Sequence, residues 1–276
     1  MSPVSFDLTG RVAIVTGAGS GLGREIALAL ARAGCDVAGA GRRPGPLVET
    51  ADAVRALGRR ALARPTDVTD SAQVDGLVAE TIAELGRVDV LVSNAGSYAE
   101  IAAKPLAELT DEEWYAGIDA NLTGAVYCAR AVLPHMTERG SGRIISIASG
   151  LGLRARRDDY VYSIAKAGVV QLTRSLAVSH GRDGVRATAL APGLFPLEAT
   201  EQERAIMGER QVAGRVGRPE EVGPVVVFLV SDAADYLNGV TLSLDGGAAT
   251  GGLVPAGLGA SAPAAASPEV TTGAAP

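Results

Sequence analysis

The sequence has few of the residues on which several classes of function depend. It carries two histidines, two cysteines and a net charge of −6 at pH 7, with an isoelectric point near 5.1. No basic stripe is present, so we expect no nucleic-acid partner, because such binding requires basic groups that neutralise phosphates. His135 and His180 fall near expected helix ends, without acidic or cysteine neighbours. We interpret them as surface or capping residues and expect no metal site.

Cysteines and long apolar runs are equally scarce. Cys35 and Cys128 stand far apart with no C-x-x-C pattern, so we expect two reduced, buried thiols. The longest late apolar stretch, 225–230, is far too short to cross a bilayer. A glycine cluster ends the apolar run after Arg11 at once, which is unlike a signal peptide. These absences predict a cytoplasmic protein with no membrane partner.

Short apolar strands alternate with longer helical patterns along most of the chain. Strands are expected at 11–16, 36–41, 61–66, 88–93, 143–148, 185–190 and 240–244, and helices at 21–33, 46–57, 71–85 and 160–180. Ser71 is expected to cap the helix that follows it, and Thr110 with Glu113 predicts a capping box. Because the apolar runs do not alternate, they suit strands buried on both sides. The pattern predicts an α/β fold, a doubly wound parallel sheet of about seven strands with helices on both faces, which is Rossmann-like.

One domain, 1–248, is expected to contain this sheet. A mostly helical insertion at 198–232 separates the sixth and seventh strands, and we interpret about 195–218 as a mobile lid. From 249 to 276 the chain is almost entirely small residues with Glu269 as its one charge. This composition predicts a disordered tail.

A glycine-rich segment follows the first expected strand and opens directly into a helix. Glycines permit a tight turn and let the backbone approach a pyrophosphate, which then lies at the positive end of the helix. The position, after the first strand of an alternating β/α series, is where a dinucleotide crevice forms. The residues expected to bind the dinucleotide here are Gly17, Gly19, Ser20, Gly21, Leu22 and Gly23.

The spacing Gly17-x-x-x-Gly21-x-Gly23 departs from G-x-G-x-x-G and resembles that of the short-chain dehydrogenase/reductase family. Further motifs agree in the family's order, namely Asn94-Ala95-Gly96, Ser149, Tyr162-x-x-x-Lys166 and Pro192-Gly193. The resemblance extends from Leu8 to about Ala248. It implies a cofactor site that also includes Asp67, Val68, Asn94, Ala95, Gly96, Tyr162, Lys166, Pro192, Gly193 and Phe195.

Two positions depart from the family's pattern. Ser93 replaces an asparagine that often precedes N-A-G. Leu197 stands where the family often places a threonine that binds the nicotinamide amide, so Thr200 or the backbone must serve instead.

Cofactor preference depends on the end of the second strand. A carboxylate there would bind the ribose hydroxyls and repel a 2′-phosphate, but this chain has Gly41 followed by Arg42 and Arg43. Guanidinium groups match phosphate geometry, so we expect NADP, with NAD as the alternative if the arginines are merely solvated.

The predicted catalytic pair is Tyr162 and Lys166. Four residues apart in a helix, they share one face. A tyrosine is a poor base at neutral pH, but a nearby ammonium favours the phenolate and lowers its pKa. Lys166 is one of two lysines in a chain that otherwise uses arginine, which favours a chemical role. Tyr160 has Ile164 four residues on and is the weaker candidate.

Two further catalytic residues follow from the family resemblance. Ser149 is implied to hydrogen-bond the substrate carbonyl, and Asn121 to hold a water for proton relay through the lysine. An ordinary buried asparagine is the alternative for Asn121.

The chain is thus expected to interconvert a ketone and a secondary alcohol of a small molecule. The alternatives are a catalytically idle sensor or scaffold that binds dinucleotide, and an enoyl reductase, which usually has a longer Tyr-to-Lys spacing. Arg154, Arg156 and Arg157 could attract an acidic substrate, or could pair with Asp158 and Asp159. Similar family members form tetramers, so a homo-oligomer, a dimer or tetramer, is implied.

Overall fold

A computed structural model describes residues 6–97 and 103–251 of the chain. Within these ranges, seven strands form one parallel sheet in the order β3-β2-β1-β4-β5-β6-β7. The strands are β1 Val12–Thr16, β2 Asp36–Gly41, β3 Ala61–Pro65, β4 Val90–Ser93, β5 Gly142–Ile147, β6 Val185–Pro192 and β7 Thr241–Leu244. The predicted doubly wound parallel sheet is confirmed, and its order reverses between β1 and β4.

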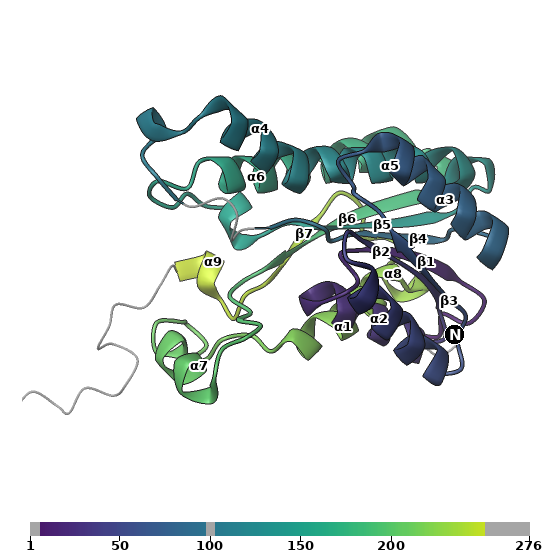
Figure 1. The fold of residues 1–276 in the computed structure, drawn as a ribbon, viewed down its shortest axis with the longest axis horizontal. Helices are drawn as coiled ribbons and strands as arrows, with labels where there is room; N and C mark the ends of the chain where they lie inside the picture. Colours follow the sequence, from purple (N-terminus) through teal and green to yellow (C-terminus); the bar gives the residue numbers. More distant parts are fainter. Residues whose placement is uncertain (1–5, 98–102, 252–276) are drawn as a thin grey trace, which may run out of the picture.

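Helices cover both faces of this sheet. They are α1 Gly21–Arg32, α2 Pro44–Ala56, α3 Ser71–Leu85, α4 Asp111–Ile118, α5 Gly124–Glu138, α6 Val161–His180, α7 Glu201–Gly208, α8 Val222–Val230 and α9 Ala248–Gly251. Helices α1, α2 and α8 lie below the sheet in Figure 1, and α3, α4, α5 and α6 lie above it. A layer of helices therefore covers each face of the sheet.

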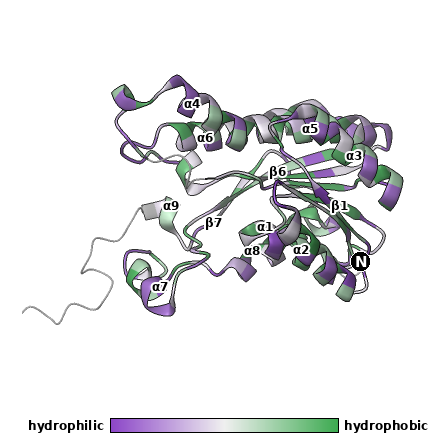
Figure 2. Cartoon of the chain, in the orientation of Figure 1, coloured by the Kyte–Doolittle hydropathy of each residue, from purple (hydrophilic) through white to green (hydrophobic). Residues whose placement is uncertain are grey.

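The core has apolar clusters on both faces of the sheet. Ile26 and Val226 are fully buried on the side of α1 and α8, and Val132 and Met136 on the side of α5. Fully burying one such side chain stabilises the fold by about 1.5–3 kcal/mol. In Figure 2 the apolar residues gather on the strands and on the inner sides of the helices. This double burial explains why the apolar runs of the strands do not alternate.

Helix starts follow capping chemistry, with one difference from expectation. The predicted capping box of Thr110 and Glu113 is present at α4. At α3, however, the N-cap is Asp70, whose carboxylate accepts hydrogen bonds from the amides of Ala72 and Gln73, and Ser71 is the first helical residue. The prediction that Ser71 caps α3 is wrong, because an acceptor one residue earlier reaches the free amides.

A π-helical turn, Asp119–Thr123, joins α4 to α5 and carries Asn121. The Asn121 side-chain amide donates to the carbonyls of Gly117 (3.1 Å) and Ser97 (3.0 Å). A widened turn of this kind leaves carbonyl oxygens without their usual helical donors, and it is frequent at functional sites. Asn121 is therefore fixed both to its own helix and to the segment after β4.

The structure describes the whole of the proposed lid but only the first residues of the tail. Segment 195–218 contains α7, whose N-cap Thr200 forms a capping box with Glu203. Its role as a lid stays a prediction. Of the predicted tail, 249–276, the first residues belong to α9, and residues 252–276 lie outside the described residues.

Both histidines have hydrogen-bonding or charged neighbours, and both cysteines are buried. The His135 Nε2 atom accepts a hydrogen bond from the Val88 amide (3.2 Å). His180 Nδ1 lies 3.3 Å from the Asp183 carboxylate, so the expectation that it has no acidic neighbour is wrong. Both cysteines are buried and free, as predicted, and burial raises the pKa of both thiols. In the described part of the chain, no three side chains of the metal-binding types gather.

Among the helices that the structure describes, none has the length and apolar character needed to cross a membrane.

Candidate active site

A cavity of about 1060 Å³ opens at the carboxyl ends of the parallel strands, where the strand order reverses between β1 and β4. Open α/β sheets bind their ligands at this point. The cavity is lined by eighteen of the nineteen predicted site residues, namely Gly17, Ser20, Gly21, Leu22, Gly23, Arg42, Asp67, Val68, Asn94, Ala95, Gly96, Asn121, Ser149, Tyr162, Lys166, Pro192, Gly193 and Phe195. Gly19 is not part of its lining.

Several glycines of the loop between β1 and α1 stand where a side chain would be strained or would clash. Gly17 and Gly21 have φ angles of 68° and 55°, which favour glycine. A side chain at Gly23 would place its β-carbon 2.2 Å from the carbonyl oxygen of Gly17. A β-carbon at Gly19 would meet Pro46 of α2 at 3.1 Å, so the loop approaches α2 closely at this point.

The ends of β1 and β4 are tied together below this loop. The Thr16 hydroxyl accepts hydrogen bonds from the amides of Asn94 and Ala95, each at 2.9 Å. The Asn94 side chain returns a bond to the Thr16 carbonyl at 2.8 Å. Thr16 is a positioning residue that sequence reasoning missed, although its place directly before the glycine loop was a usable signal.

Ser149 and Tyr162 enter the cavity from either end of one connection. Ser149 follows β5, and its hydroxyl accepts a hydrogen bond from the Leu151 amide (3.1 Å). Tyr162 is the second residue of α6. The Lys166 Nζ atom lies 5.6 Å from the centre of the Tyr162 ring. The helical spacing thus brings both side chains to the same cavity, as the sequence predicts.

Lys166 is buried, with 4% of its surface exposed. Its Nζ atom donates to the carbonyl of Ile147, at the end of β5, at 3.0 Å. Burial lowers the pKa of Lys166 to about 8, because the charged form loses water. The carbonyl of Ile147 is a second partner that the motifs did not predict.

Asn121 and Lys166 meet at Gly96. A β-carbon at Gly96 would lie 2.6 Å from Asn121 Oδ1 and 3.4 Å from Lys166 Nζ. Asn121 Oδ1 is buried and has no hydrogen-bond partner among the described residues. Buried acceptors are normally satisfied, so this oxygen suits a donor that enters with solvent or ligand.

These features fit a nicotinamide dinucleotide. The glycine-rich loop would admit a pyrophosphate at the start of α1, and the cavity extends from there to Tyr162. At the end of β2 the lining includes Gly41, Arg42 and Arg43. Arg43 also donates to the Ser20 hydroxyl at 3.2 Å, so it connects this end of the cavity to the glycine loop. Both arginines that follow the second strand therefore line the cavity.

Leu197 lies over the glycine loop. Its Cδ1 atom is 2.7 Å from the place that a β-carbon at Gly21 would occupy, and it lines the cavity. Thr200, one of the two replacements that the sequence suggests, instead exchanges hydrogen bonds with Glu203 at the start of α7. The Thr200 side chain therefore caps α7.

Comparison with known proteins agrees with this geometry. A family model described as "Enoyl-(Acyl carrier protein) reductase" matches residues 17–249. The chain is 45% identical to cis-4-hydroxycyclohexanecarboxylate dehydrogenase of Sinomonas cyclohexanicum, over 86% of this chain and 96% of that protein. It is 36% identical to 2-dehydro-3-deoxy-D-gluconate 5-dehydrogenase of Escherichia coli, over 88% of this chain and 97% of that one.

A solved structure is similar as well. The crystal structure of a putative gluconate dehydrogenase from Agrobacterium tumefaciens superposes with a TM-score of 0.83 at 35% identity, covering 90% of this chain and 99% of that one. The relatives carry the names of dehydrogenases and reductases that act on alcohols and ketones, and none of these names describes an idle scaffold. The chain belongs to the short-chain dehydrogenase/reductase family and is an oxidoreductase of alcohol and ketone groups that uses a nicotinamide nucleotide.

Proposed function

We propose that Tyr162 is the general acid/base of an NADP-dependent oxidoreductase that interconverts a ketone and a secondary alcohol. The observation that carries this proposal is the setting of Lys166. Its ammonium group is buried near the Tyr162 ring, and Ser149 and Asn121 line the same cavity. A fixed positive charge in a partly dry site stabilises a nearby phenolate more strongly than the same charge in water.

The chain's own residues then have separate tasks. Ser149 holds the carbonyl oxygen of the substrate, and Tyr162 donates a proton to that oxygen in reduction or removes it in oxidation. Lys166 supports the phenolate form, and Asn121 Oδ1 accepts a hydrogen bond from the water that replenishes the proton. A nicotinamide bound in this cavity would supply the hydride in reduction and accept it in oxidation, and Gly17, Gly21 and Gly23 would hold its pyrophosphate.

A preference for NADP is supported by the end of β2. Gly41 leaves no carboxylate at that point to bind the ribose hydroxyls, and Arg42 and Arg43 line the cavity beside it. Two guanidinium groups there would bind a 2′-phosphate through charge-assisted hydrogen bonds.

For the substrate we propose a hydroxy acid. The names of two relatives describe substrates that carry a carboxylate. In each, the carbon that is oxidised lies four bonds along the carbon skeleton from the carboxyl carbon. These are carbon 4 of the hydroxycyclohexanecarboxylate and carbon 5 of the gluconate derivative. The same separation would suit a single anion-binding residue at the far side of the cavity from the glycine loop.

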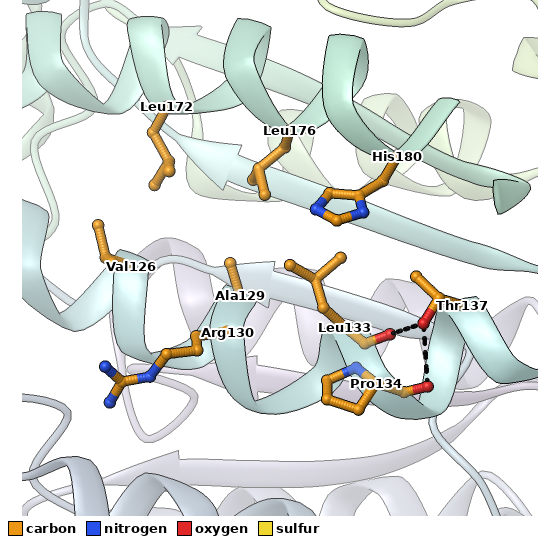
Figure 3. Close-up of a pocket in the computed structure, with 9 residues that line it drawn as sticks. All are labelled: Val126, Ala129, Arg130, Leu133, Pro134, Thr137, Leu172, Leu176 and His180. Carbon is orange, nitrogen blue, oxygen red and sulfur yellow. Dashed lines mark hydrogen bonds between the residues drawn. The ribbon is translucent and has the colours of Figure 1, made fainter. Parts of the chain in front are cut away.

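The proposal also includes a homo-oligomer in the cytoplasm. Two buried free thiols are consistent with a reducing compartment. A second, apolar hollow of about 390 Å³ lies between α5 and α6, where Leu172 and Leu176 face Ala129 and Leu133 (Figure 3). Exposed apolar surface of this kind often marks contacts between protein chains. A second copy of the chain is the proposed occupant.

The test is the oxidation of cis-4-hydroxycyclohexanecarboxylate, its methyl ester and cyclohexanol, each with NADP⁺ and NAD⁺. Tyr162→Phe should lower kcat by about 10²- to 10⁴-fold. Tyr160→Phe is the matched control, because Tyr160 is the exposed N-cap of α6. Equal turnover by wild type and Tyr162→Phe would refute the mechanism.

Other outcomes separate the remaining alternatives. A strong preference for NAD⁺ would overturn the assignment of Arg42 and Arg43 alone. Dinucleotide binding without oxidation or reduction across a broad carbonyl panel would favour the sensor. Reduction of an enoyl thioester, with no activity on ketones, would favour the enzyme that the family model's description names.

A further inference from the structure

The connection between Ser149 and Tyr162 carries three arginines, Arg154, Arg156 and Arg157, on an exposed segment. It begins and ends on residues that line the cavity, so a side chain in its middle lies within reach of a bound substrate. The sequence does not distinguish the three arginines, because they are of one type and nearly adjacent. Their positions in the fold do.

The segment is fixed at both ends. At its start, a β-carbon at Gly152 would lie 2.7 Å from the backbone of Lys166, so the chain packs directly against α6. At its end, the Asp158 carbonyl accepts a hydrogen bond from the Lys104 amide at 2.9 Å, and Asp159 is buried. The Asp159 amide donates to the Arg156 carbonyl at 3.3 Å, which closes a tight turn. The backbone of Arg156 is therefore held in a defined place.

Arg156 and Arg157, although adjacent in the sequence, have different surroundings. Asp158 has a φ of 59°, in the left-handed region that aspartate tolerates better than most residues. Its carboxylate pairs with the Arg157 guanidinium at 3.3 Å, outside the cavity. Of the three arginines, Arg156 is the one that lines the cavity together with Ser149, Leu151 and Tyr162.

Charge on this side of the cavity favours an anion. Arg156 and Lys166 are the basic lining residues contributed by the connection after β5 and by α6. The acidic lining residues, Asp67 and Asp119, come from other elements, and each accepts a hydrogen bond from a threonine hydroxyl, at 2.8 Å and 2.9 Å. The connection that carries Arg156 therefore contributes no acidic residue to the cavity lining.

We propose that Arg156 binds the carboxylate of the substrate and so sets the specificity of the enzyme. This inference rests on the proposed function, because Tyr162 defines where the other end of the substrate must lie. The planar guanidinium can donate two parallel hydrogen bonds to a carboxylate. The fixed backbone of residue 156 would set the distance from that anchor to the reacting carbon.

The experiment compares the hydroxy acid with its methyl ester in wild type, Arg156→Gln and Arg157→Gln. Wild type should prefer the acid. Arg156→Gln should lower kcat/KM for the acid by about 10- to 100-fold, mainly through KM, and leave the ester unchanged. Arg157→Gln is the matched control, because Arg157 is exposed and pairs with Asp158. Arg156→Lys should restore part of the preference for the acid.

A binding measurement keeps this test separate from the test of catalysis. In the presence of NADP⁺, cyclohexanecarboxylate should raise the Tm of wild type and of Tyr162→Phe, but not that of Arg156→Gln. Protection of Arg156→Gln equal to that of wild type, or equal turnover of acid and ester by wild type, would overturn the assignment of Arg156. Protection by the anion without any turnover would instead refute the proposed function.

Discussion

At the scale of single residues, Lys166 is the most unusual group in the described part of the chain. Its ammonium is buried, and burial lowers its pKa from the ordinary value of 10.5 to about 8. Between these two pH values the unfolded chain binds more protons than the native state does. The free energy of unfolding therefore rises with pH across this window, and below pH 8 the buried charge destabilises the fold.

Replacing Lys166 by methionine tests this directly. With cofactor supplied, the Lys166→Met variant should be inactive. Without cofactor, its free energy of unfolding at pH 7 should exceed that of wild type by at most on the order of 3 kcal/mol. The difference should shrink as the pH rises from about 8 to about 10.5. Urea unfolding at several pH values measures it.

The chain's other lysine provides the control. Lys104 pairs with Glu113 near the surface, so Lys104→Met should show no such pH dependence. The hydrogen bond to Ile147 is also lost in Lys166→Met, and this loss changes the free energy of unfolding by an amount that does not depend on pH. For that reason the change with pH, and not the absolute value, is decisive: a constant difference would argue against burial as the cause.

At the scale of elements, the close packing of the glycine loop between β1 and α1 makes larger residues at its glycines unfavourable. Gly23→Ala would bring a β-carbon within 2.2 Å of the Gly17 carbonyl oxygen. We expect a loss of about 1–3 kcal/mol in stability, as for other overpacked positions. The displaced loop should also weaken NADPH binding at least about tenfold, which corresponds to about 1.4 kcal/mol.

Gly45→Ala is the matched substitution. Gly45 lies in α2, and a β-carbon there would meet nothing within 4 Å. Alanine in place of this helical glycine should raise stability by about 0.5–1 kcal/mol and leave the affinity for NADPH as it is. Urea unfolding and fluorescence titration with NADPH measure both effects. Unaltered NADPH affinity in Gly23→Ala would show that the loop does not hold the pyrophosphate.

At the scale of the whole molecule, the apolar hollow between α5 and α6 predicts how copies of the chain associate. Val126 lines this hollow and is 36% exposed. Val126→Asp would place a charge in the proposed contact, so we expect a smaller assembly than that of wild type. Size-exclusion chromatography with light scattering measures the mass.

Val48→Asp controls for the added charge, since Val48 is 49% exposed on α2, on the opposite face of the sheet. It should leave the mass unchanged. A monomeric wild type, or a wild-type mass in Val126→Asp, would remove this surface from consideration.

The extent to which the sequence predicts this molecule depends on the range of the interactions involved. Strand β2 and the end of helix α3 have the predicted bounds, because Gly41 and Gly86 mark these ends locally. The cavity lining follows from the order of motifs along parallel strands, whose carboxyl ends share one edge.

What could not be predicted depends on contacts made through space. The π-turn at Asn121 has no residue pattern of its own, and the cap at α3 depended on a difference of one position between Asp70 and Ser71. Arg156 lines the cavity and Arg157 pairs with Asp158, a difference that depends on the folded path of this segment and that residue type alone does not mark. Leu197 reaches the glycine loop across a long stretch of chain.

The anchored connection between Ser149 and Tyr162 has a consequence for evolution and engineering. Its two ends are built into the sheet and into α6, whereas the side chains from Leu153 to Arg157 are exposed. Those five positions can vary without altering the backbone that presents the proton donor. A lineage, or a designer, could therefore exchange this short stretch to change which alcohol is accepted, and keep the same chemistry for each new substrate.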